Sequence, residues 1–232
     1  MQKIYLYLVL SGLITLAACN GGNQVNQQEN VASPPEEAIK AGQAEEEKNI
    51  LFFGNSLTAG YGLDPSEAFP ALIQKKIDSL GYNYKVVNAG LSGETTSAGK
   101  NRVEWVLRQP VDIFILELGG NDGLRGISPE ETRRNLEEII DKVRQLYPEV
   151  KILLAGMQIP PSMGQSYANQ FQEIFPKVAR EKDVELVPFL LEGVGGERDL
   201  NLPDGIHPNV EGHQIVADNV WQELKPMLEE ES

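Results

Sequence analysis

The fold is decided by the stretch Ile113-Phe114-Ile115-Leu116-Glu117-Leu118-Gly119-Gly120 in the middle of the chain. This is the most apolar of several short runs, and it ends in two glycines, as a buried strand does when it meets a loop. Similar runs lie before and after it, and segments with helical spacing separate them. Buried strands that alternate with helices predict a parallel sheet covered on both faces.

Five strands and five helices are expected from this alternation. The expected strands are 50–53, 85–87, 113–118, 151–155 and 184–187, and the expected helices are 67–80, 97–108, 129–147, 167–181 and 210–224. The third helix is the best specified, because Ser128 suits the N-cap, Pro129 the first helical position and Glu131 the third position of a capping box. With right-handed crossovers, the predicted fold class is α/β: a three-layer α/β/α sandwich around a five-stranded parallel sheet.

The composition limits the partners of the chain. Its 232 residues suit one domain with appendages, and 34 acidic against 20 basic side chains give a net charge of −14. A nucleic-acid-binding protein needs basic patches that replace counterions, so nucleic acid is excluded as a partner. The same charge argues against loose electrostatic adsorption to anionic lipid. No cluster of cysteines or histidines suggests a metal, and none is expected.

The N-terminus resembles a bacterial export signal. Lys3 precedes the mostly apolar run 4–16, which is shorter than the roughly 20 residues of a transmembrane helix. Leu16-Ala17-Ala18-Cys19 resembles a lipoprotein box, in which the cysteine is lipidated and becomes the new N-terminus. The alternative is an ordinary cleaved signal with a chance cysteine. Because Cys19 is the only cysteine and ends the apolar run, lipidation is favoured.

These segments predict a signal peptide at 1–18, a flexible acidic tether at 19–48 and a folded domain at 49–228. The tether is rich in Asn, Gln, Glu, Pro and Ala, so it buries too little apolar surface to offset the entropy of ordering. The predicted location is outside the cytoplasm. A lipid on Cys19 would anchor the protein to a bacterial cell membrane, on its periplasmic or cell-surface face.

Polar, glycine-rich stretches follow the first three strands and the fifth. They are 54–58, 88–95, 119–123 and 204–207. Ligands of parallel α/β sheets bind outside the carboxyl ends of the strands, so we expect all four stretches at one edge of the sheet. The last contains His207, one of only two histidines, and Asp204 three residues before it. Neutral imidazole is the usual general base, and a carboxylate can orient it.

Acyl transfer is the chemistry that these groups favour. A serine becomes a nucleophile beside an oriented base, and backbone N–H groups with an asparagine amide can stabilise the oxyanion. Ser56 directly follows a strand, whereas Ser92 lies in Gly90-Leu91-Ser92-Gly93-Glu94. That sequence misses the Gly-x-Ser-x-Gly elbow at its last residue. The strand-to-helix position favours Ser56, but the residues alone leave the choice open.

Taken together, the four stretches resemble the SGNH hydrolase (GDSL esterase/lipase) superfamily over about residues 49–225, and the resemblance implies its flavodoxin-like fold. It implies Ser56 as nucleophile, with Asp204 and His207 as the other catalytic residues. The implied oxyanion hole consists of the N–H groups of Ser56 and Gly93 and the amide of Asn121. Residues 119–126, which read GGNDGLRG, are most similar to the thioesterase I/lysophospholipase/arylesterase branch.

One residue departs from the family pattern. The first block usually reads Gly-Asp-Ser-Leu, and here Asn55 replaces the aspartate. Since Asp204 provides the acid of the triad, the replacement leaves the implied mechanism in place. Asparagine forms similar turn hydrogen bonds, so the change only weakens any role for a charge at this position.

The expected function is therefore a serine esterase that acts without a cofactor on a small-molecule acyl ester, such as an aryl ester or a lysophospholipid. Two alternatives remain open: a carbohydrate O-deacetylase, as found among relatives in the superfamily, and a non-catalytic surface-binding lipoprotein. The oligomeric state is not determined by the sequence.

Several residues near the expected site have two interpretations. Loops 123–127 and 157–164 either form an apolar acyl pocket or only cover the end of the sheet, and the residues concerned are Leu124, Ile127, Met157, Ile159, Pro160 and Met163. His213 is expected as a surface or helix-packing residue rather than a catalytic one. Asp122 is either catalytic or a residue that stabilises its turn, and the second role is favoured.

Overall fold

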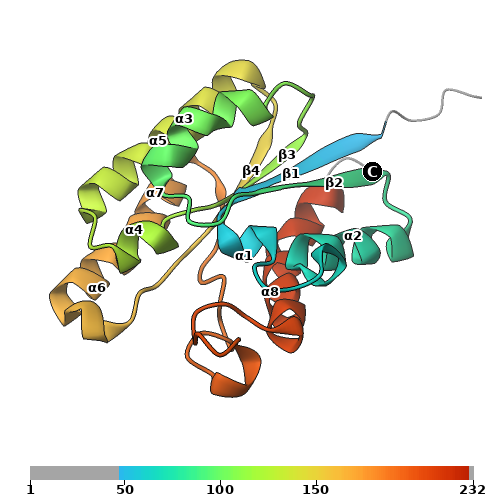
Figure 1. The fold of residues 1–232 in the computed structure, drawn as a ribbon. Coiled ribbons are helices and arrows are strands. Elements are labelled where there is room, and N and C mark those ends of the chain that lie inside the picture. The colour runs from blue at the N-terminus through green and yellow to red at the C-terminus, as the bar shows by residue number, and fades with distance from the viewer. Residues whose placement is uncertain (1–46, 230–232) are drawn as a thin grey trace, which may run out of the picture. The chain divides into compact units, whose positions relative to one another are not determined.

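The structure is a computed structural model that describes residues 47–229. The expected signal peptide, Cys19 and almost all of the expected tether lie outside these residues. A parallel sheet forms the centre of the described part, in the order β2-β1-β3-β4-β5 (Figure 1). Its strands are β1 (Lys48–Gly54), β2 (Tyr84–Gly90), β3 (Ile113–Glu117), β4 (Lys151–Ala155) and β5 (Glu185–Val187). The predicted five-stranded parallel sheet is therefore confirmed, and β1 begins one residue inside the expected tether.

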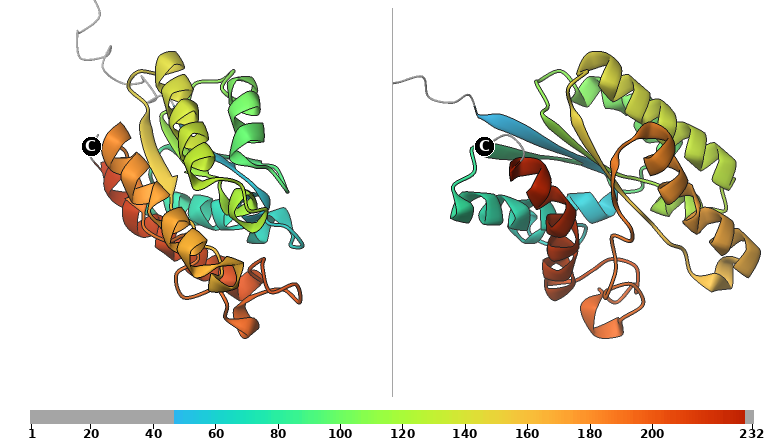
Figure 2. Two further views of the ribbon diagram at one scale, coloured as in Figure 1. Left: turned by 90° about the vertical axis from the view of Figure 1, so that its left-hand side faces the viewer. Right: turned by 180° about the vertical axis from the view of Figure 1, so that it is seen from behind.

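Helices cover both faces of the sheet (Figure 2). α3, α5 and α7 pack side by side on one face, and α2 and α8 pack together on the other. The helices are α1 (Ser56–Ala59), α2 (Phe69–Leu80), α3 (Thr96–Val106), α4 (Gly120–Leu124), α5 (Pro129–Leu146), α6 (Gln165–Gln172), α7 (Ile174–Lys182) and α8 (Val210–Glu229). Short 3₁₀ turns occupy Pro65–Glu67, Pro161–Met163 and Arg198–Leu200. This is the predicted three-layer sandwich.

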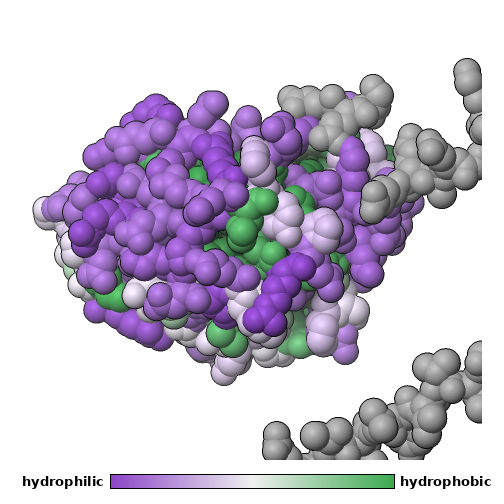
Figure 3. Space-filling view, turned by 90° about the horizontal axis from the view of Figure 1, so that it is seen from above, coloured by the Kyte–Doolittle hydropathy of each residue, from purple (hydrophilic) through white to green (hydrophobic). Residues whose placement is uncertain are grey.

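The core consists of the strands and the inner faces of the helices. Every residue of β3 is buried, and Phe53 and Phe114 on neighbouring strands pack with their ring centroids 5.7 Å apart. Burial on both faces explains why the strands read as continuous apolar runs. Seen from above, hydrophilic residues cover α3 and α5, and apolar residues gather in a patch near the middle of that face (Figure 3).

Two helix predictions differ from the structure. The expected helix 167–181 divides into α6 and α7 at Glu173, because Pro176 has no N–H to donate to the carbonyl of Gln172 and its ring crowds that carbonyl. The predicted capping box at Ser128 is absent, since the Ser128 side chain makes no cap hydrogen bond. A capping box does occur in the described residues at Asp64 and Glu67.

Three further features of the helices were not predicted. α8 continues five residues beyond Leu224 to Glu229, and its last turn buries Met227 and Leu228 against the core. The short helices α1 and α4 begin directly after β1 and β3. With four and five residues, they are too short to show an apolar periodicity in the sequence.

Candidate active site

The sheet order places a crevice at the carboxyl ends of β1 and β3. After β1 the chain goes to β2 on one side, and after β3 it goes to β4 on the other. The connections therefore leave these two strands in opposite directions. Such a switch point is where parallel α/β folds bind ligands. Ser56 is the first residue of α1, directly after β1, and Asn121 lies in α4, directly after β3.

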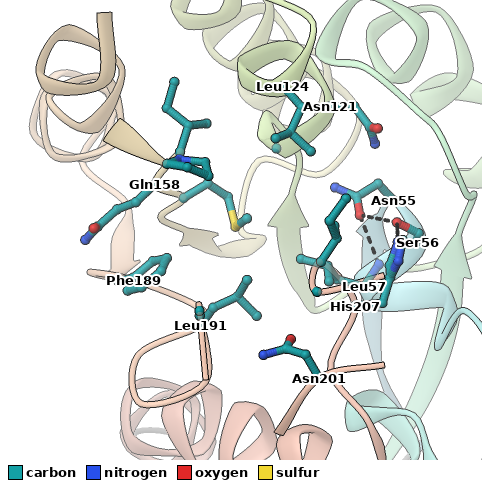
Figure 4. Close-up of a pocket in the computed structure, with 18 of the residues that line it drawn as sticks. Asn55, Ser56, Leu57, Asn121, Leu124, Gln158, Phe189, Leu191, Asn201 and His207 are labelled. Carbon is teal, nitrogen blue, oxygen red and sulfur yellow. Dashed lines mark hydrogen bonds between the residues drawn. The ribbon is translucent and has the colours of Figure 1, made fainter. Parts of the chain in front are cut away.

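Ser56, His207 and Asp204 form one chain of hydrogen bonds. Oγ of Ser56 lies 2.9 Å from Nε2 of His207, and Nδ1 of the same ring lies 2.7 Å from Oδ2 of Asp204. Figure 4 shows Ser56 and His207 next to each other at one end of a pocket. The structure thus brings together the three residues that the sequence singled out, in the arrangement that activates a serine.

The turn that contains Asp204 is organised by the carboxylate itself. Its Oδ1 accepts hydrogen bonds from the N–H groups of Ile206 and His207, at 2.9 and 3.0 Å. Burial opposes ionisation of the carboxyl, but the hydrogen bonds from the N–H and ring of His207 and from the N–H of Ile206 lower its pKa to about 2. Asp204 is therefore ionised across the neutral range, as a carboxylate that orients a histidine must be.

Tyr61 covers the outer face of the histidine ring. The centroids of the Tyr61 and His207 rings are 4.5 Å apart and the rings are inclined by 37°, although half of the Tyr61 side chain is exposed. The N–H of Tyr61 donates to the carbonyl of Ser56 at 3.0 Å. Tyr61 therefore packs against the base while its backbone is tied to the candidate nucleophile.

The candidate oxyanion donors come from two loops that are bonded to each other. The Asn121 amide donates to the carbonyl of Glu94 at 3.1 Å, and the buried Glu94 carboxylate forms an ion pair with the partly exposed Arg102. Gly93 has a φ of +80°, which a glycine adopts without strain, and its carbonyl accepts a hydrogen bond from Arg125 at 3.0 Å. Asn121 lines the same pocket as Ser56, whereas Gly93, on the loop between β2 and α3, is not among the lining residues.

Asp122, the residue after Asn121, stabilises the loops of the candidate oxyanion donors. Its side chain is fully buried and accepts hydrogen bonds from the hydroxyl and N–H of Thr96, at 2.5 and 2.9 Å. Burial raises its pKa, and the bonds from Thr96 oppose that shift. Asp122 thus ties the start of α3 to α4, which agrees with the expected turn-stabilising role rather than a catalytic one.

A pocket of about 470 Å³ extends from Ser56 and His207 (Figure 4). Its walls are mostly apolar, and the apolar side chains lining it are Leu57, Leu124, Met157, Ile159, Pro160, Pro161, Phe189, Leu191 and Ile206. Loops 123–127 and 157–164 therefore contribute to the wall through four of the six residues expected there. Ile127 and Met163 are not among the lining residues.

The remaining candidates lie elsewhere. Ser92 is in an exposed turn, and within residues 47–229 neither histidine is bonded to it. His213 is almost fully buried, and its Nδ1 accepts a hydrogen bond from the N–H of Phe69 at 3.1 Å. The helix-packing role expected for His213 is therefore correct, and the surface role is wrong.

Residues 47–229 contain neither a candidate metal cluster nor a helix suited to span a membrane. No set of three or more His, Cys, Asp or Glu side chains in this range is placed to hold a metal ion. No helix of the described range combines the length and the apolar character needed to cross a membrane.

Sequence reasoning missed three parts of the site. It did not find Tyr61, Glu117, which supports Asn55, or the far wall formed by Phe189 and Leu191. The signal for Glu117 was present, because a glutamate inside an otherwise apolar strand is costly unless its charge is bonded. The wall residues gave no signal, since they lie in the long irregular stretch before Asp204.

Comparison with known proteins identifies similar chains over nearly all of the described range. The sequence profile of the GDSL-like Lipase/Acylhydrolase family matches residues 52–215. "Esterase TesA" of Pseudomonas aeruginosa is 41% identical over 182 residues, which are 78% of this chain and 90% of that protein. The "Thioesterase 1/protease 1/lysophospholipase L1" of Escherichia coli K12 is 39% identical over 184 residues, or 79% and 86% of the two chains.

A solved structure shares the fold. The crystal structure of TesA has a TM-score of 0.74 and 41% sequence identity, and the match covers 78% of this chain and 99% of that one. With this identity and coverage, the similarity extends to the amino-acid sequence and is not limited to the fold.

Proposed function

The chain belongs to the GDSL-like lipase/acylhydrolase family, with an esterase and a thioesterase/lysophospholipase among its relatives, and from this premise we propose that it is a serine esterase of acyl esters. In this proposal Ser56 is the nucleophile, His207 the general base and Asp204 the residue that orients the ring. One observation carries the assignment: the hydrogen-bonded chain from Ser56 through His207 to Asp204, with distances of 2.9 and 2.7 Å, opens into an apolar pocket.

The proposed reaction has two halves. In the first, Nε2 of His207 takes the hydroxyl proton as Oγ of Ser56 bonds to the carbonyl carbon. The bond to the leaving oxygen then breaks, and the alcohol departs with the proton from His207. In the second half, water gives its proton to His207 and attacks the acyl carbon. The bond to Ser56 breaks, the serine regains the proton, and the carboxylic acid is released.

The oxyanion of both halves needs donors that are already in place. We assign this role to the N–H groups of Ser56 and Gly93 and to the amide of Asn121. The hydrogen bond from the Asn121 amide to the carbonyl of Glu94 supports this assignment, because it holds the amide at the edge of the pocket. Losing one such donor typically lowers the rate by on the order of a hundredfold or more.

The pocket supports a proposal for the substrate class. A volume of about 470 Å³ with mostly apolar walls suits an acyl chain or an aromatic ring better than a sugar, which needs polar partners. Aryl esters and lysophospholipids are therefore the substrates that we propose. The names of the relatives, an esterase and a thioesterase/lysophospholipase, support the same choice.

The test is an activity panel with the purified domain. It contains acetyl, butyryl, octanoyl and dodecanoyl aryl esters, a lysophospholipid and an acyl thioester, measured with Ser56→Ala and Ser92→Ala. We expect hydrolysis that Ser56→Ala lowers by about a thousandfold or more and that Ser92→Ala leaves unchanged. Activity that survives in Ser56→Ala but not in Ser92→Ala would reassign the nucleophile. Hydrolysis confined to acetyl esters would favour the deacetylase, and no hydrolysis at all would favour a binding protein.

We also propose that the protein is exported and anchored by a lipid on Cys19. This part rests on the sequence of residues 1–19 alone. We expect the wild-type protein in the membrane fraction and the Cys19→Ser variant in the soluble fraction outside the cytoplasm. Retention of that variant in the membrane fraction would contradict the proposal without affecting the assignment of the catalytic residues.

A further inference from the structure

Glu117 is a buried carboxyl group next to the candidate nucleophile. It is the last residue of β3, is 1% exposed, and lies opposite Gly54 in the pairing of β1 with β3. A Cβ atom at residue 54 would lie 2.1 Å from Oγ1 of Thr58 and 2.6 Å from Oε2 of Glu117. The glycine before Asn55 and Ser56 therefore leaves the space into which this carboxylate fits.

The two oxygens of Glu117 have different partners. Oε2 accepts from the N–H of Asn55 at 3.0 Å and from the N–H and hydroxyl of Thr58, at 3.3 and 2.8 Å. Oε1 accepts from the side-chain Nδ2 of Asn55 at 2.7 Å. Each of these partners is bonded as a donor, so the site calls for a group that only accepts. An ionised carboxylate is such a group.

The bond to Oε1 fixes the orientation of the Asn55 amide. With Nδ2 held by Glu117, the other end of the amide, Oδ1, must face α1. There it accepts from the N–H of Leu57 at 2.9 Å and lies 3.3 Å from Oγ of Ser56. Oγ of Ser56 is thus within hydrogen-bond distance of two acceptors, Oδ1 of Asn55 and Nε2 of His207, and its one hydrogen is donated to either of them in turn.

We propose that Glu117 is a positioning residue for the nucleophile, which acts through the side-chain amide of Asn55. It holds the Oδ1 atom toward Ser56 and so sets the direction of the serine side chain before the acyl group binds. The proposal rests on Ser56 being the nucleophile, as proposed above. Burial raises the pKa of Glu117 to about 7, and the hydrogen bonds from Asn55 and Thr58 favour the charged form but offset only part of that rise.

A pair of substitutions separates this role from a general contribution to folding. In Glu117→Gln, the new side-chain oxygen can replace Oε2 and keep its three donors, but the new NH₂ group then faces Nδ2 of Asn55. Two NH₂ groups cannot hydrogen-bond to each other, so the Asn55 amide turns over. Its Oδ1 atom then no longer faces Leu57 and Ser56. In the double variant Asn55→Asp/Glu117→Gln, one oxygen of the new carboxylate at position 55 accepts from the new amide at position 117. Its other oxygen faces Leu57 and Ser56.

The readouts are kcat and KM for a short aryl ester, the rate at which a fluorophosphonate labels Ser56, and the melting temperature. We expect Glu117→Gln to lower kcat and the labelling rate by about tenfold or more with little change in KM. The double variant should recover to within about threefold of the wild type. The matched control is Thr58→Val, which removes one hydrogen bond from the same carboxylate without affecting the Asn55 amide. It should lose stability but keep kcat.

Three results would overturn the proposal. They are a Glu117→Gln variant with unchanged kcat, a double variant as slow as the single one, and a Thr58→Val variant with an equal loss of kcat. If Glu117→Gln does not fold, the double variant decides, because its only mismatch is repaired: a folded and active protein supports the proposal, and an unfolded one contradicts it. Activity that persists in Ser56→Ala would instead contradict the assignment of Ser56 as the nucleophile in the proposed function.

Discussion

Nε2 of His207 lies 2.9 Å from Oγ of Ser56, although 151 residues separate the two along the chain. Ser56 is placed by the end of β1, a largely buried strand that pairs with β2 on one side and β3 on the other. His207 is placed by a turn that ends a long irregular segment and leads into α8. The bond between them therefore forms only when β1 and the segment between β5 and α8 are both in place.

Asp204→Asn should lower kcat/KM by at least about a hundredfold. The side-chain oxygen of the new amide can still accept from the N–H groups of Ile206 and His207, so the turn should keep its shape. Its NH₂ group, however, meets Nδ1 of His207 as a donor and favours the wrong tautomer. Steady-state kinetics and a thermal melt distinguish this effect from unfolding. An Asp204→Asn variant with more than a tenth of wild-type activity would argue against Asp204 as the orienting acid.

Tyr61→Ala should lower kcat by on the order of tenfold, because the His207 ring loses the aromatic face packed 4.5 Å from it and gains freedom to turn away from Ser56. Tyr61→Phe keeps the ring and is the matched control, so its kcat should equal that of the wild type. The comparison uses the same ester for both variants. Equal losses in the two variants would mean that the hydroxyl, not the packing, is required.

Leu191→Trp should shorten the acyl chain that the enzyme accepts. Leu191 and Phe189 lie across the pocket from Ser56 (Figure 4), so a larger side chain there reduces the space for the end of a long chain. We expect kcat/KM for dodecanoyl esters to fall by about tenfold, with little change for acetyl esters. Leu146→Trp, on an exposed helix end outside the pocket, is a suitable control. A uniform loss over all chain lengths would place the acyl chain elsewhere.

His213 should make the protein less stable at acidic pH. Its burial, and to a smaller degree the nearby His207, lower its pKa from 6.5 to about 4. Between these two values the unfolded chain binds a proton that the folded chain does not, so stability is lost as the pH falls from about 6.5 to about 4. The loss is on the order of 3 kcal/mol for a shift of this size.

The His213→Asn variant isolates this contribution. The side-chain oxygen of the new amide can accept the N–H of Phe69 as Nδ1 does now, but it does not titrate. Glu117 shifts in the opposite sense, since its raised pKa of about 7 removes stability as the pH rises from about 4.5 to 7. The quantity to measure is therefore the difference in the free energy of unfolding between variant and wild type, obtained from urea unfolding at pH 7 and again at pH 4.5. An unchanged difference would show that His213 does not titrate in this way.

The sequence predicted most of the fold because its signals are local. Continuous apolar runs such as 113–118 specify strands buried on both faces, and their alternation with helices leaves few arrangements. Predictions were weaker where one residue decides the outcome. Pro176 divides the expected helix 167–181, and Ser128 makes no cap hydrogen bond despite a favourable pattern.

The sequence by itself determined the chemical types at the site: a serine after the first strand, an Asp-x-x-His turn, and polar stretches that follow parallel strands and must meet at one edge. Only the tertiary structure decided which groups touch. It paired His207 with Ser56, brought Glu117 beside Gly54 and Asn55, and packed Tyr61 on the histidine ring. The reason is physical: local patterns fix elements and the direction of strands, whereas contacts between distant side chains depend on register and packing, which no single stretch encodes.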